Sequence, residues 1–570
     1  MIKVFSVAEM VAAEKASDAA GNSYDEMMEK AGWTVAEAIR ERYPVTGSKV
    51  TILVGPGNNG GDGLVAGRYL AEWGADVSFY LYKERDLETD RNLAMVQEMN
   101  LPIVISELDQ RYRVLRSRLR ITNILVDALL GTGVSRPVGG NLAKLMQEVK
   151  AVLEARALFE IEESRSRLIS IADPGTGARA QPGLGDTNQL LSTANSQKSD
   201  VSIAQPDLHI VAVDCPSGLN CDSGELDDLA MPADLTVTFA GPKRGQFIFP
   251  GAAACGEIVV ADIDISAKLP EVAGVQVELA TAEMARTFMP DRPIDGHKGT
   301  FGWALIAAGS VRYWGAAVLA GQAAYRTGAG LVALAVPSSI RPAVATQLPE
   351  ATYPLIADDD VLTAQSAIKL LEDMDIYHAL LVGPGLYEAG AFLETLLSST
   401  EVDLPPMVID ADGLNLLSQM LDWPSRLAAG TILTPHPGEM ARLAGSSLSE
   451  IKARDRVELA REKAAEWDCV VLLKGAFTIV AAPDGRCAIL PFANPALAVA
   501  GSGDVLSGIV VALLGQKLPP FEAAVLGGYL HAAAAQISGV DVGLLAGEIA
   551  DLVPEVMEIL KTRKNSILIR

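Results

Sequence analysis

Glycine-rich loops that follow apolar, β-rich segments are the first residues of this sequence that could do chemistry. The clearest is segment 54–63, VGPGNNGGDG, between the β-rich residues 50–54 and a predicted helix over residues 64–73. Closely spaced glycines let backbone N–H groups approach a phosphate, and a helix N-terminus favours anions. A tight turn that needs positive φ would explain one glycine pair, but this density favours an anion-binding loop. The spacing matches neither the dinucleotide fingerprint nor a P-loop.

Two further loops each begin with an acid at the end of a predicted strand. Asp127 is the first residue of the loop 127–137, and Asp214 is the first residue of the loop 214–218. In open α/β sheets the carboxyl ends of the strands line the ligand crevice, so both acids are expected there. Each loop alone could be an ordinary turn whose residue types serve only the turn conformation. Three such loops at one sheet edge favour a nucleotide-like ligand.

In the second half, residues 500–509, AGSGDVLSGI, could transfer a phosphoryl group. The amides of Gly501, Ser502 and Gly503 would form an anion hole, and Asp504 would accept a hydroxyl proton. The alternative is that Asp504 only caps a helix after a flexible turn. Glycines, acid and small-residue helix together resemble the signature of ribokinase-like enzymes.

Parallel α/β sheets must position these motifs. Strand, glycine loop, helix and strand follow one another over residues 50–82, and a second α/β pattern begins at residue 303. We predict an α/β protein, with an N-terminal Rossmann-like three-layer domain followed by a C-terminal ribokinase-like α/β domain. The predicted boundaries are residues 1–270, a linker at 271–284, and residues 285–570, with a polar insertion at about 171–206.

Composition excludes several functional classes. The 570 residues carry a net charge of −24, which argues against nonspecific binding of nucleic acid or anionic membranes, since those surfaces demand clustered Lys and Arg. A hydrophobic content of 49% excludes disorder of the whole chain. The 5 cysteines are scattered, and no apolar run reaches the ~18–20 residues of a membrane helix. We therefore expect a cytoplasmic protein with neither a nucleic-acid nor a membrane partner.

The first half resembles the NAD(P)H-hydrate epimerase domain over about residues 1–270. Four motifs carry the resemblance: Asn58–Asp62, Asp127 with Gly131–Gly133, Asp214–Gly218, and Gly241–Gly245. It implies that the hydrated dinucleotide is bound by the following residues: Asn58, Asn59, Gly60, Gly61, Asp62, Gly131, Thr132, Gly133, Val134, Ser135, Arg136, Pro137 and Asp214. The insertion departs from the family pattern.

The resemblance also implies roles for single side chains. Asn59, Asp127 and Ser217 would hold a potassium ion (K⁺), and their amide, carboxylate and hydroxyl oxygens suit a hard cation. Asp214 is the predicted general acid/base that inverts the hydrated ring carbon, with Lys243 as its charge partner. The alternative for Asp214 is a cap on the following turn.

The second half is similar to the ADP- or ATP-dependent NAD(P)H-hydrate dehydratases over nearly all of residues 285–570. The motifs are residues 296–302, 328–330, 382–386, 410–412, 434–440, 474–478, 494–495 and the 501–504 loop. The resemblance implies that Gly330, Gly385, His436 and Asp504 contact the hydrate. It implies that the adenine nucleotide is bound by Lys474, Gly475, Ala476, Phe477, Thr478 and Gly503. Ser502 stands where many relatives have Thr and keeps the hydroxyl.

Together the two resemblances imply a bifunctional enzyme. The first domain would interconvert the R and S epimers of hydrated NADH or NADPH. The second would phosphorylate the S epimer with ADP or ATP and eliminate phosphate, with Asp504 as base and Mg²⁺ as charge partner of the nucleotide. We also expect a homo-oligomer. Two alternatives remain open: a ribokinase-like small-molecule kinase fused to a nucleotide-binding regulatory domain, and a first domain that is only a nucleotide sensor.

Overall fold

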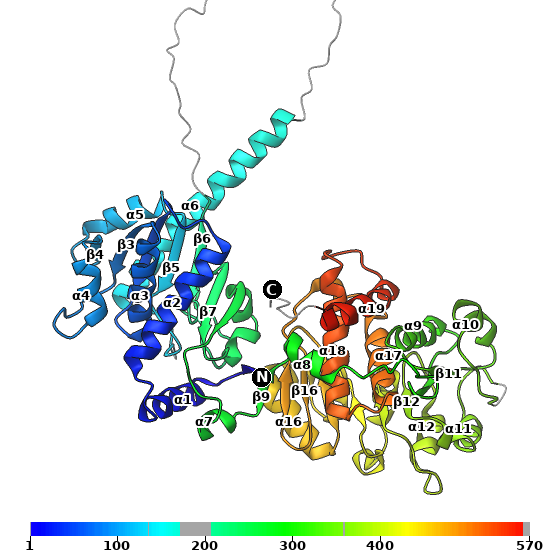
Figure 1. Ribbon diagram of the computed structural model, residues 1–570. Helices are drawn as coiled ribbons and strands as arrows, with labels where there is room; N and C mark the ends of the chain where they lie inside the picture. The colour runs from blue at the N-terminus through cyan, green and yellow to red at the C-terminus, as the bar shows by residue number, and fades with distance from the viewer. Residues whose placement is uncertain (1, 135, 172–206, 357–358, 563–570) are drawn as a thin grey trace, which may run out of the picture. The chain divides into compact units, whose positions relative to one another are not determined.

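The structure is a computed structural model that describes residues 2–134, 136–171, 207–356 and 359–562. It divides into two compact units, each with its own sheet and core (Figure 1). The first comprises Glu14–Ile265, and the second comprises Met1–Ala13 with Ser266–Arg570. The predicted insertion lies outside the described residues apart from its first position, residue 171.

The Glu14–Ile265 unit contains a seven-stranded parallel sheet in the order β4-β3-β2-β5-β6-β7-β8. Its strands are β2 (Lys49–Val54), β3 (Asp76–Leu81), β4 (Ile103–Ile105), β5 (Ile124–Ala128), β6 (His209–Val213), β7 (Leu235–Phe239) and β8 (Glu257–Ala261). The chain runs outward from β2 to β4, then returns to β5 and runs the other way. The order therefore reverses between β2 and β5, where open α/β sheets bind their ligands.

Helices cover both faces of this sheet. They are α2 (Tyr24–Arg42), α3 (Asn58–Glu72), α4 (Arg91–Glu98), α5 (Arg113–Leu119) and α6 (Gly140–Ile171), and α1 (Val7–Ala19) precedes them. Ile52 and Val54 of β2 belong to the core that contains α2 and α3, whereas Leu53 belongs to the core that contains α5 and α6. This alternation, with both faces buried, makes the unit three-layered.

Helix α3 begins earlier than the sequence predicts. It starts at Asn58 rather than near residue 64, so Gly60, Gly61 and Gly63 are helical. Some of these glycines serve packing: a Cβ at Gly63 would lie 2.6 Å from the Cβ of Ala128. The predicted loop is therefore a short turn plus the first turns of a helix that packs closely on its sheet.

The second unit contains a ten-stranded mixed sheet in the order β1-β9-β17-β16-β15-β14-β13-β12-β10-β11. Its strands are β1 (Ile2–Lys3), β9 (Val277–Leu279), β10 (Trp303–Ala307), β11 (Leu331–Ala335), β12 (Ala379–Val382), β13 (Met407–Ile409), β14 (Ile432–Leu433), β15 (Val470–Leu473), β16 (Ile479–Ala481) and β17 (Cys487–Ile489). The six strands from β15 to β11 in this order are parallel. The order reverses between β10 and β12.

The segment 271–284, predicted as a linker, lies within this second unit. Its strand β9 pairs with β17 and with the N-terminal strand β1. Val277 and Leu279 are buried, and Lys3 Nζ lies 2.7 Å from Glu278 Oε1. The difference has a physical reason: the apolar alternation of three residues is enough to add a strand once a sheet edge is available.

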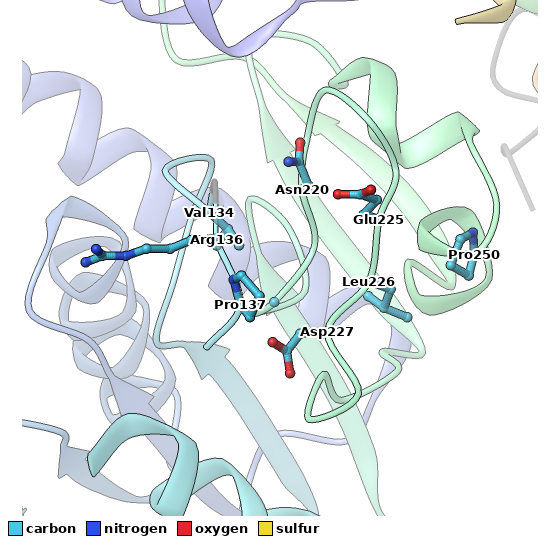
Figure 2. A pocket seen from close by; sticks show the side chains of 9 residues that line it. Val134, Arg136, Pro137, Asn220, Glu225, Leu226, Asp227 and Pro250 are labelled. Atoms are coloured by element: carbon cyan, nitrogen blue, oxygen red, sulfur yellow. The ribbon is translucent and has the colours of Figure 1, made fainter. Parts of the chain in front are cut away.

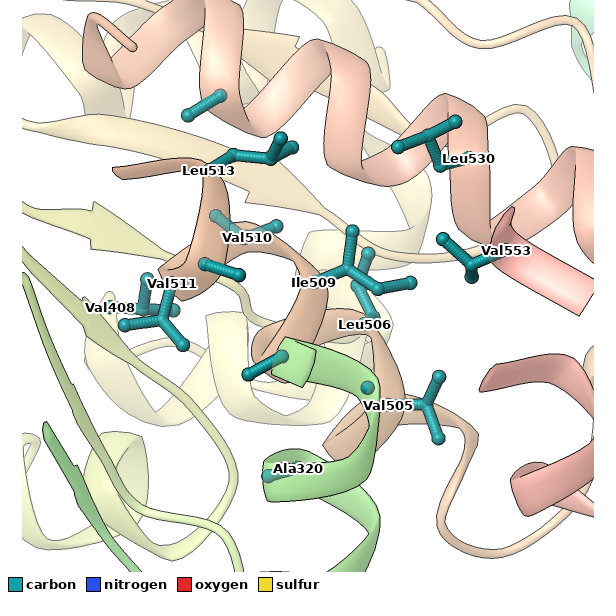
Figure 3. Packing of buried hydrophobic residues seen from close by; sticks show 14 of the residues in the cluster. Ala320, Val408, Val505, Leu506, Ile509, Val510, Val511, Leu513, Leu530 and Val553 are labelled. Atoms are coloured by element: carbon teal, nitrogen blue, oxygen red, sulfur yellow. The ribbon is translucent and has the colours of Figure 1, made fainter. Parts of the chain in front are cut away.

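Helix α17 is buried along nearly its whole length, and its apolar residues pack in the core of the second unit (Figure 3). The helices are α7 (Pro270–Ala273), α8 (Ala282–Phe288), α9 (Trp314–Arg326), α10 (Arg341–Gln347), α11 (Ala364–Leu371), α12 (Gly390–Leu397), α13 (Asp412–Leu417), α14 (Pro437–Leu443), α15 (Leu448–Ala453), α16 (Arg456–Trp467), α17 (Ser502–Gly515), α18 (Pro520–Ile537) and α19 (Ala546–Thr562). Val505 and Ile509 of α17 pack with Leu530 of α18 and Val553 of α19. The α/β class predicted for both halves is confirmed.

In the described ranges, no helix combines the length and the apolar character needed to cross a bilayer.

Close packing of α17 against α9 predicts a sharp cost for one added methyl group. A Cβ at Gly508 would lie 2.3 Å from the carbonyl oxygen of Ala320, whereas a Cβ at Gly515 of the same helix would meet nothing closer than 3.8 Å. Gly508→Ala should lower the free energy of unfolding by about 1–3 kcal/mol, because backbone cannot yield locally. Gly515→Ala is the matched control and should be neutral or stabilising. Calorimetric melting of both variants checks this; equal melting temperatures would contradict it.

Candidate active sites

The loops after β5 and β6 are joined by a buried carboxylate. Asp127 accepts hydrogen bonds from Ser217 Oγ at 2.6 Å and from Ser217 N at 2.9 Å. Ser217 Oγ in turn accepts from Leu130 N at 2.9 Å, and Asn59 Nδ2 donates to Leu130 O at 3.0 Å. The three residues predicted to hold K⁺ therefore lie together at the reversal of the sheet.

Asp127 has an unusual charge environment. It is completely buried, and burial raises its pKa, although hydrogen bonds from Ser217 work in the opposite direction. Within the described ranges no Lys, Arg or His forms an ion pair with it. A buried carboxylate without a cationic partner is costly. The oxygen donors and the uncompensated charge fit a bound monovalent cation.

The turn before α3 is shaped by close backbone approach and by one arginine. A Cβ at Gly55 would lie 1.8 Å from Leu129 O, so only glycine fits this position. Arg85 Nη1 donates to the carbonyls of Gly55 (2.6 Å) and Gly57 (3.2 Å), and Arg85 Nε donates to Asp90. Arg85 therefore fixes the backbone of the turn directly before the first amides of α3. No sequence motif indicated Arg85, because it follows β3 whereas the glycine turn follows β2.

Asp214 is held in a strained conformation by a buried lysine. Its φ is +64°, which is rare for a residue with a side chain. Its Oδ1 accepts from Lys243 Nζ at 2.5 Å and from Thr238 Oγ1 at 3.1 Å, and its backbone carbonyl accepts from Gln246 Nε2 at 2.9 Å. Burial lowers the pKa of Lys243, but the charge and hydrogen bond of Asp214, together with Cys221 and Cys215, outweigh burial and raise it. The predicted Asp214–Lys243 partnership is thus present in the structure.

A second acid, Asp62, lies near this pair. Burial raises the pKa of Asp62 well above its ordinary value, and the charges of Asp214 and Glu14 raise it further. Glu14 of α1 also has a pKa raised by burial. One acid paired with a lysine, beside another that resists ionisation, gives groups suited to accept and to donate a proton. Glu14 was not expected from the sequence.

A pocket of about 390 Å³ extends from the same loops (Figure 2). Val134, Arg136 and Pro137 form one wall, and residues between 218 and 227 form the other. Asp227 joins its walls, since its carboxylate accepts from Val138 N at 2.8 Å. Gly131 lies against Asn59, and a Cβ at Gly133 would meet no atom within 4 Å. Ser135, predicted with this set, lies outside the described residues.

The second unit gathers its chemistry around Lys474, directly after β15. Lys474 Nζ lies 2.7 Å from Asp410 Oδ1 and 3.5 Å from Glu439 Oε2. It also lies 3.6 Å from the position of a Cβ on Gly503. Burial lowers the pKa of Lys474, but the charges of Asp410 and Glu439 outweigh burial and raise it. Its ammonium group therefore stays charged beside the predicted anion hole.

Asp410 is a residue that the sequence prediction did not select. It is 1% exposed, and in the described part of the chain its Oδ2 has no hydrogen-bond partner. That oxygen lies 3.8 Å from the Cβ position of Gly503. Its place directly after β13, in the motif 410–412, was the available signal. Glu439 of the motif 434–440 was likewise not selected.

Asp504 lies in the first turn of α17, and its pKa is suited to a general base. Burial raises its pKa to about 7, with Asp410 adding to the effect and Lys474 opposing it. Gly501 precedes it with φ +89°, and Leu319 of α9 and Ala546 of α19 would contact a Cβ there. A carboxylate with a pKa near neutrality at a helix N-terminus can take a proton while neighbouring amides stabilise an anion, and the amide of Ser502 itself donates to Val499 O at 3.3 Å.

Ser502 is bonded to a buried histidine that the sequence did not indicate. Its Oγ lies 3.0 Å from His531 Nε2, and both residues are buried. Burial lowers the pKa of His531 to about 4, so the ring is neutral. His531 lies inside the alanine-rich helix α18, where only the fold brings it to the loop.

His436 serves both as a helix cap and as an exposed ring at the site. Its Nδ1 accepts from the amides of Gly438 at 2.9 Å and Glu439 at 3.3 Å, at the start of α14. The Nε2 atom lies 3.3 Å from Glu439 Oε1. Burial lowers the pKa of His436, and the charge of Lys474 lowers it further. A neutral ring is thus held beside the Lys474 cluster.

The predicted nucleotide loop, residues 474–478, is braced by Arg456. Arg456 Nη1 donates to Ala476 O at 2.6 Å, and its guanidinium would lie 2.9 Å from a Cβ at Gly475, whose φ is +143°. Thr478 Oγ1 donates to Gly475 O at 2.8 Å. Phe477 also has a positive φ, of +51°. The loop is therefore rigid before any ligand binds.

The structure brings Gly385, His436 and Asp504 to the carboxyl edge of the sheet but leaves Gly330 elsewhere. Gly330 directly precedes β11, so it lies at the amino edge. A Cβ there would lie 1.7 Å from Lys298 O, so packing also requires glycine at this position. The motif resemblance could not separate a close backbone approach from a ligand contact, because both demand glycine.

Comparison with known protein families now gives these two sites an identity. A model described as NAD(P)H-hydrate dehydratase matches residues 304–554, and one described as YjeF-related protein N-terminus matches residues 24–160 and 175–245. The bifunctional NAD(P)H-hydrate repair enzyme Nnr of Moorella thermoacetica is 34% identical over 559 residues, which cover 95% of this chain and 94% of the relative. The Escherichia coli enzyme of that name is 30% identical over 560 residues, covering 97% and 93%.

Among solved structures, the chain is similar to the ADP/ATP-dependent NAD(P)H-hydrate dehydratase of Bacillus subtilis, co-crystallized with ATP/Mg²⁺. The two are 35% identical with a TM-score of 0.44, over 50% of this chain and 99% of that one. The full-length relatives establish that the chain belongs to the family of bifunctional NAD(P)H-hydrate repair enzymes. The two predicted domains are confirmed by the two family models, one matching each half of the chain.

The buried His531 predicts a specific acid sensitivity of folding. Its pKa is about 4 in the folded chain against an ordinary value of 6.5, so between these pH values only the unfolded chain binds the proton. Stability should therefore fall as pH falls from about 6.5 to 4, by on the order of 1–3 kcal/mol. His531→Gln should reduce the slope of melting temperature against pH in this window.

His297→Gln is the matched control, because His297 is an exposed histidine of the same unit. It should keep the wild-type slope. An unchanged slope in His531→Gln would show that burial of this imidazole does not govern acid sensitivity.

Proposed function

We propose that the chain repairs hydrated nicotinamide cofactors with two separate active sites. The Glu14–Ile265 unit epimerises R- and S-NAD(P)H hydrate, and the second unit dehydrates the S epimer with ADP or ATP. The observation that carries this proposal is Asp504: a carboxyl with a pKa near 7 at a glycine anion hole, beside a charged lysine. A homo-oligomer stays a prediction.

In the dehydratase site, Asp504 accepts the proton of the substrate hydroxyl while that oxygen attacks the terminal phosphorus of the nucleotide. AMP leaves from ADP, or ADP leaves from ATP. The amides of residues 501–503 and the Lys474 ammonium group stabilise the charge on the transferring phosphoryl group. Phosphate then leaves together with a ring proton, which restores the reduced nicotinamide. Phosphorylation is needed because hydroxide is a poor leaving group.

A magnesium ion fits the carboxylates of this site. Mg²⁺ is commonly held by one or two carboxylates together with substrate phosphates. Asp410 offers a buried oxygen without a partner among the described residues, and Glu439 lies on the other side of Lys474. We propose Asp410 and Glu439 as the residues that would hold it. When bound, the ion would offset negative charge on the nucleotide phosphates.

In the epimerase site, Asp214 is the proposed proton carrier. Lys243 keeps its carboxylate oriented, and the strained backbone fixes its direction into the crevice. Asp62, whose pKa is raised by burial, would donate a hydrogen bond to the hydrate as a neutral acid. The first amides of α3 and residues 131–137 are the proposed dinucleotide contacts. K⁺ held by Asn59, Asp127 and Ser217 would stabilise the loops that carry them.

The two activities should separate cleanly by substitution. With racemic hydrate and ADP or ATP, wild type should convert nearly all substrate, as followed by the absorbance of the reduced nicotinamide. Asp504→Asn should lower the dehydration rate by about 10²-fold or more while epimerisation continues. Asp214→Asn should convert only the S half at a normal rate. Loss of both activities in either variant would contradict separate sites, and a stable phosphorylated product would indicate a small-molecule kinase instead.

The K⁺ assignment predicts a cation effect that depends on Asp127. In KCl, the epimerase should work faster and the Glu14–Ile265 unit should melt at a higher temperature than in N-methylglucamine chloride of equal ionic strength, because a bound ion stabilises the folded state. Asp127→Asn should abolish this difference. A response of wild-type size in Asp127→Asn, or no response in wild type, would contradict the assignment.

A further inference from the structure

The reversal of strand order in the second unit marks the expected ligand crevice beside Gly385, the predicted hydrate contact, and the side chains around it have no role in the chemistry proposed above. The loops after β10 and β12 flank this reversal, and the reversal point is where open α/β sheets bind ligands. The two loops contact each other directly: Gly309 N donates to Pro384 O at 2.8 Å. A Cβ at Gly385 would lie 2.7 Å from the Cβ of Tyr313, so the predicted hydrate contact lies against this tyrosine.

Two aromatic side chains lie on the loops beside this reversal: Tyr313 is exposed and Tyr387 is half-buried. The ring centroids of Tyr313 and Tyr387 lie 6.5 Å apart at an angle of 60°, and the guanidinium of Arg312 lies 4.7 Å from the centroid of Tyr387. Tyr313 is 51% exposed. Aromatic rings partly exposed to solvent beside a catalytic edge, with a cation among them, suit a planar ring that bears phosphate.

The backbone of Tyr387 is held in a strained conformation. Its φ is +55°, a conformation that side-chain-bearing residues rarely adopt and that persists mainly at functional sites. Its N–H donates to Asp412 Oδ2 at 2.9 Å, and the charge of Asp412 also acts on Asp504. The tyrosine is therefore held by the same acid that borders the catalytic base.

The loop after β10 contains a buried hydroxyl group, that of Ser310, which could bind a ligand. Ser310 is 2% exposed, and in the described part of the chain its Oγ has no hydrogen-bond partner. A buried hydroxyl without a partner is costly unless a ligand or water completes it. This observation is independent of the tyrosines.

The position of the crevice selects one of the two substrates. The proposed nucleotide loop follows β15, which lies four strands from β10, or about 19 Å at ~4.8 Å per strand. Asp504 and the anion hole lie between, beside Asp410 of the β13 loop. Adenine of ADP or ATP therefore belongs to the β15 side, and the crevice is left for the hydrate.

We propose that Tyr313, Tyr387 and Arg312 form a subsite for the adenosine end of the hydrated dinucleotide. This inference rests on the proposed dehydratase function. The hydrated nicotinamide must present its hydroxyl to Asp504 and has lost its full conjugation, so adenine is the one aromatic base of this substrate. It stacks on the tyrosine rings, and Arg312 pairs with the pyrophosphate.

Comparing two substrates tests this subsite in the full-length protein. Hydrated NADH and the hydrated nicotinamide mononucleotide differ by the adenosine monophosphate portion alone. Wild type should have a higher kcat/KM for the dinucleotide. Tyr313→Ala should lower kcat/KM for the dinucleotide by about tenfold, leave the mononucleotide and the KM of ADP unchanged, and so remove the preference. Tyr313→Phe keeps the ring and should keep the preference.

Leu421→Ala is the control, since it removes an 83% exposed apolar side chain beyond the end of α13. An equal loss for both substrates in Tyr313→Ala, a rise in the KM of ADP, or no preference in wild type would overturn the subsite. Absence of any dehydration by wild type would instead contradict the proposed function. Melting temperatures of the variants, measured in parallel, exclude loss of folding as the cause.

Discussion

Both sites depend on the close approach of two loop backbones, which only glycine permits. A Cβ at Gly55 would lie 1.8 Å from Leu129 O, and a Cβ at Gly383 would lie 1.8 Å from Asp410 O. Each approach joins loops that follow neighbouring parallel strands, β2 with β5 and β12 with β13. The acids Asp127 and Asp410 are fixed by these contacts. Without them, neither crevice would have its shape.

The two units use a similar electrostatic arrangement in unrelated sheets. In each, a lysine is paired with one buried acid, Lys243 with Asp214 and Lys474 with Asp410. A further acid nearby has its pKa raised by burial. Pairing with lysine orients one carboxylate, while burial raises the pKa of the other, to about 7 for Asp504, and so favours proton exchange there. The arrangement also explains how a chain with net charge −24 can act on phosphorylated ligands: helix amides and single lysines supply the positive potential locally.

Much of the fold and part of each site could be predicted from local sequence. Apolar runs that end in Asp or Gly predicted the strands and their ligand-binding ends, since burial on both faces leaves a continuous apolar pattern. Local patterns misplaced the start of α3, because a glycine-rich helix N-terminus resembles a loop. They also misplaced the segment around β9, because a strand of three residues forms only where a sheet edge is available to pair with it. Glycine motifs also grouped Gly330 with residues of the opposite edge, although its contact is with the backbone of Lys298.

The sequence by itself determined the family, the two activities that the family implies, and the residues within each short motif, because these depend on residue type and spacing along the chain. Only the tertiary structure decided which distant side chains complete the sites. Arg85 at the β2 turn, Asp410 with Lys474 and His531 with Ser502 are contacts between separate elements. Such contacts follow from strand order and helix packing, which no local pattern encodes.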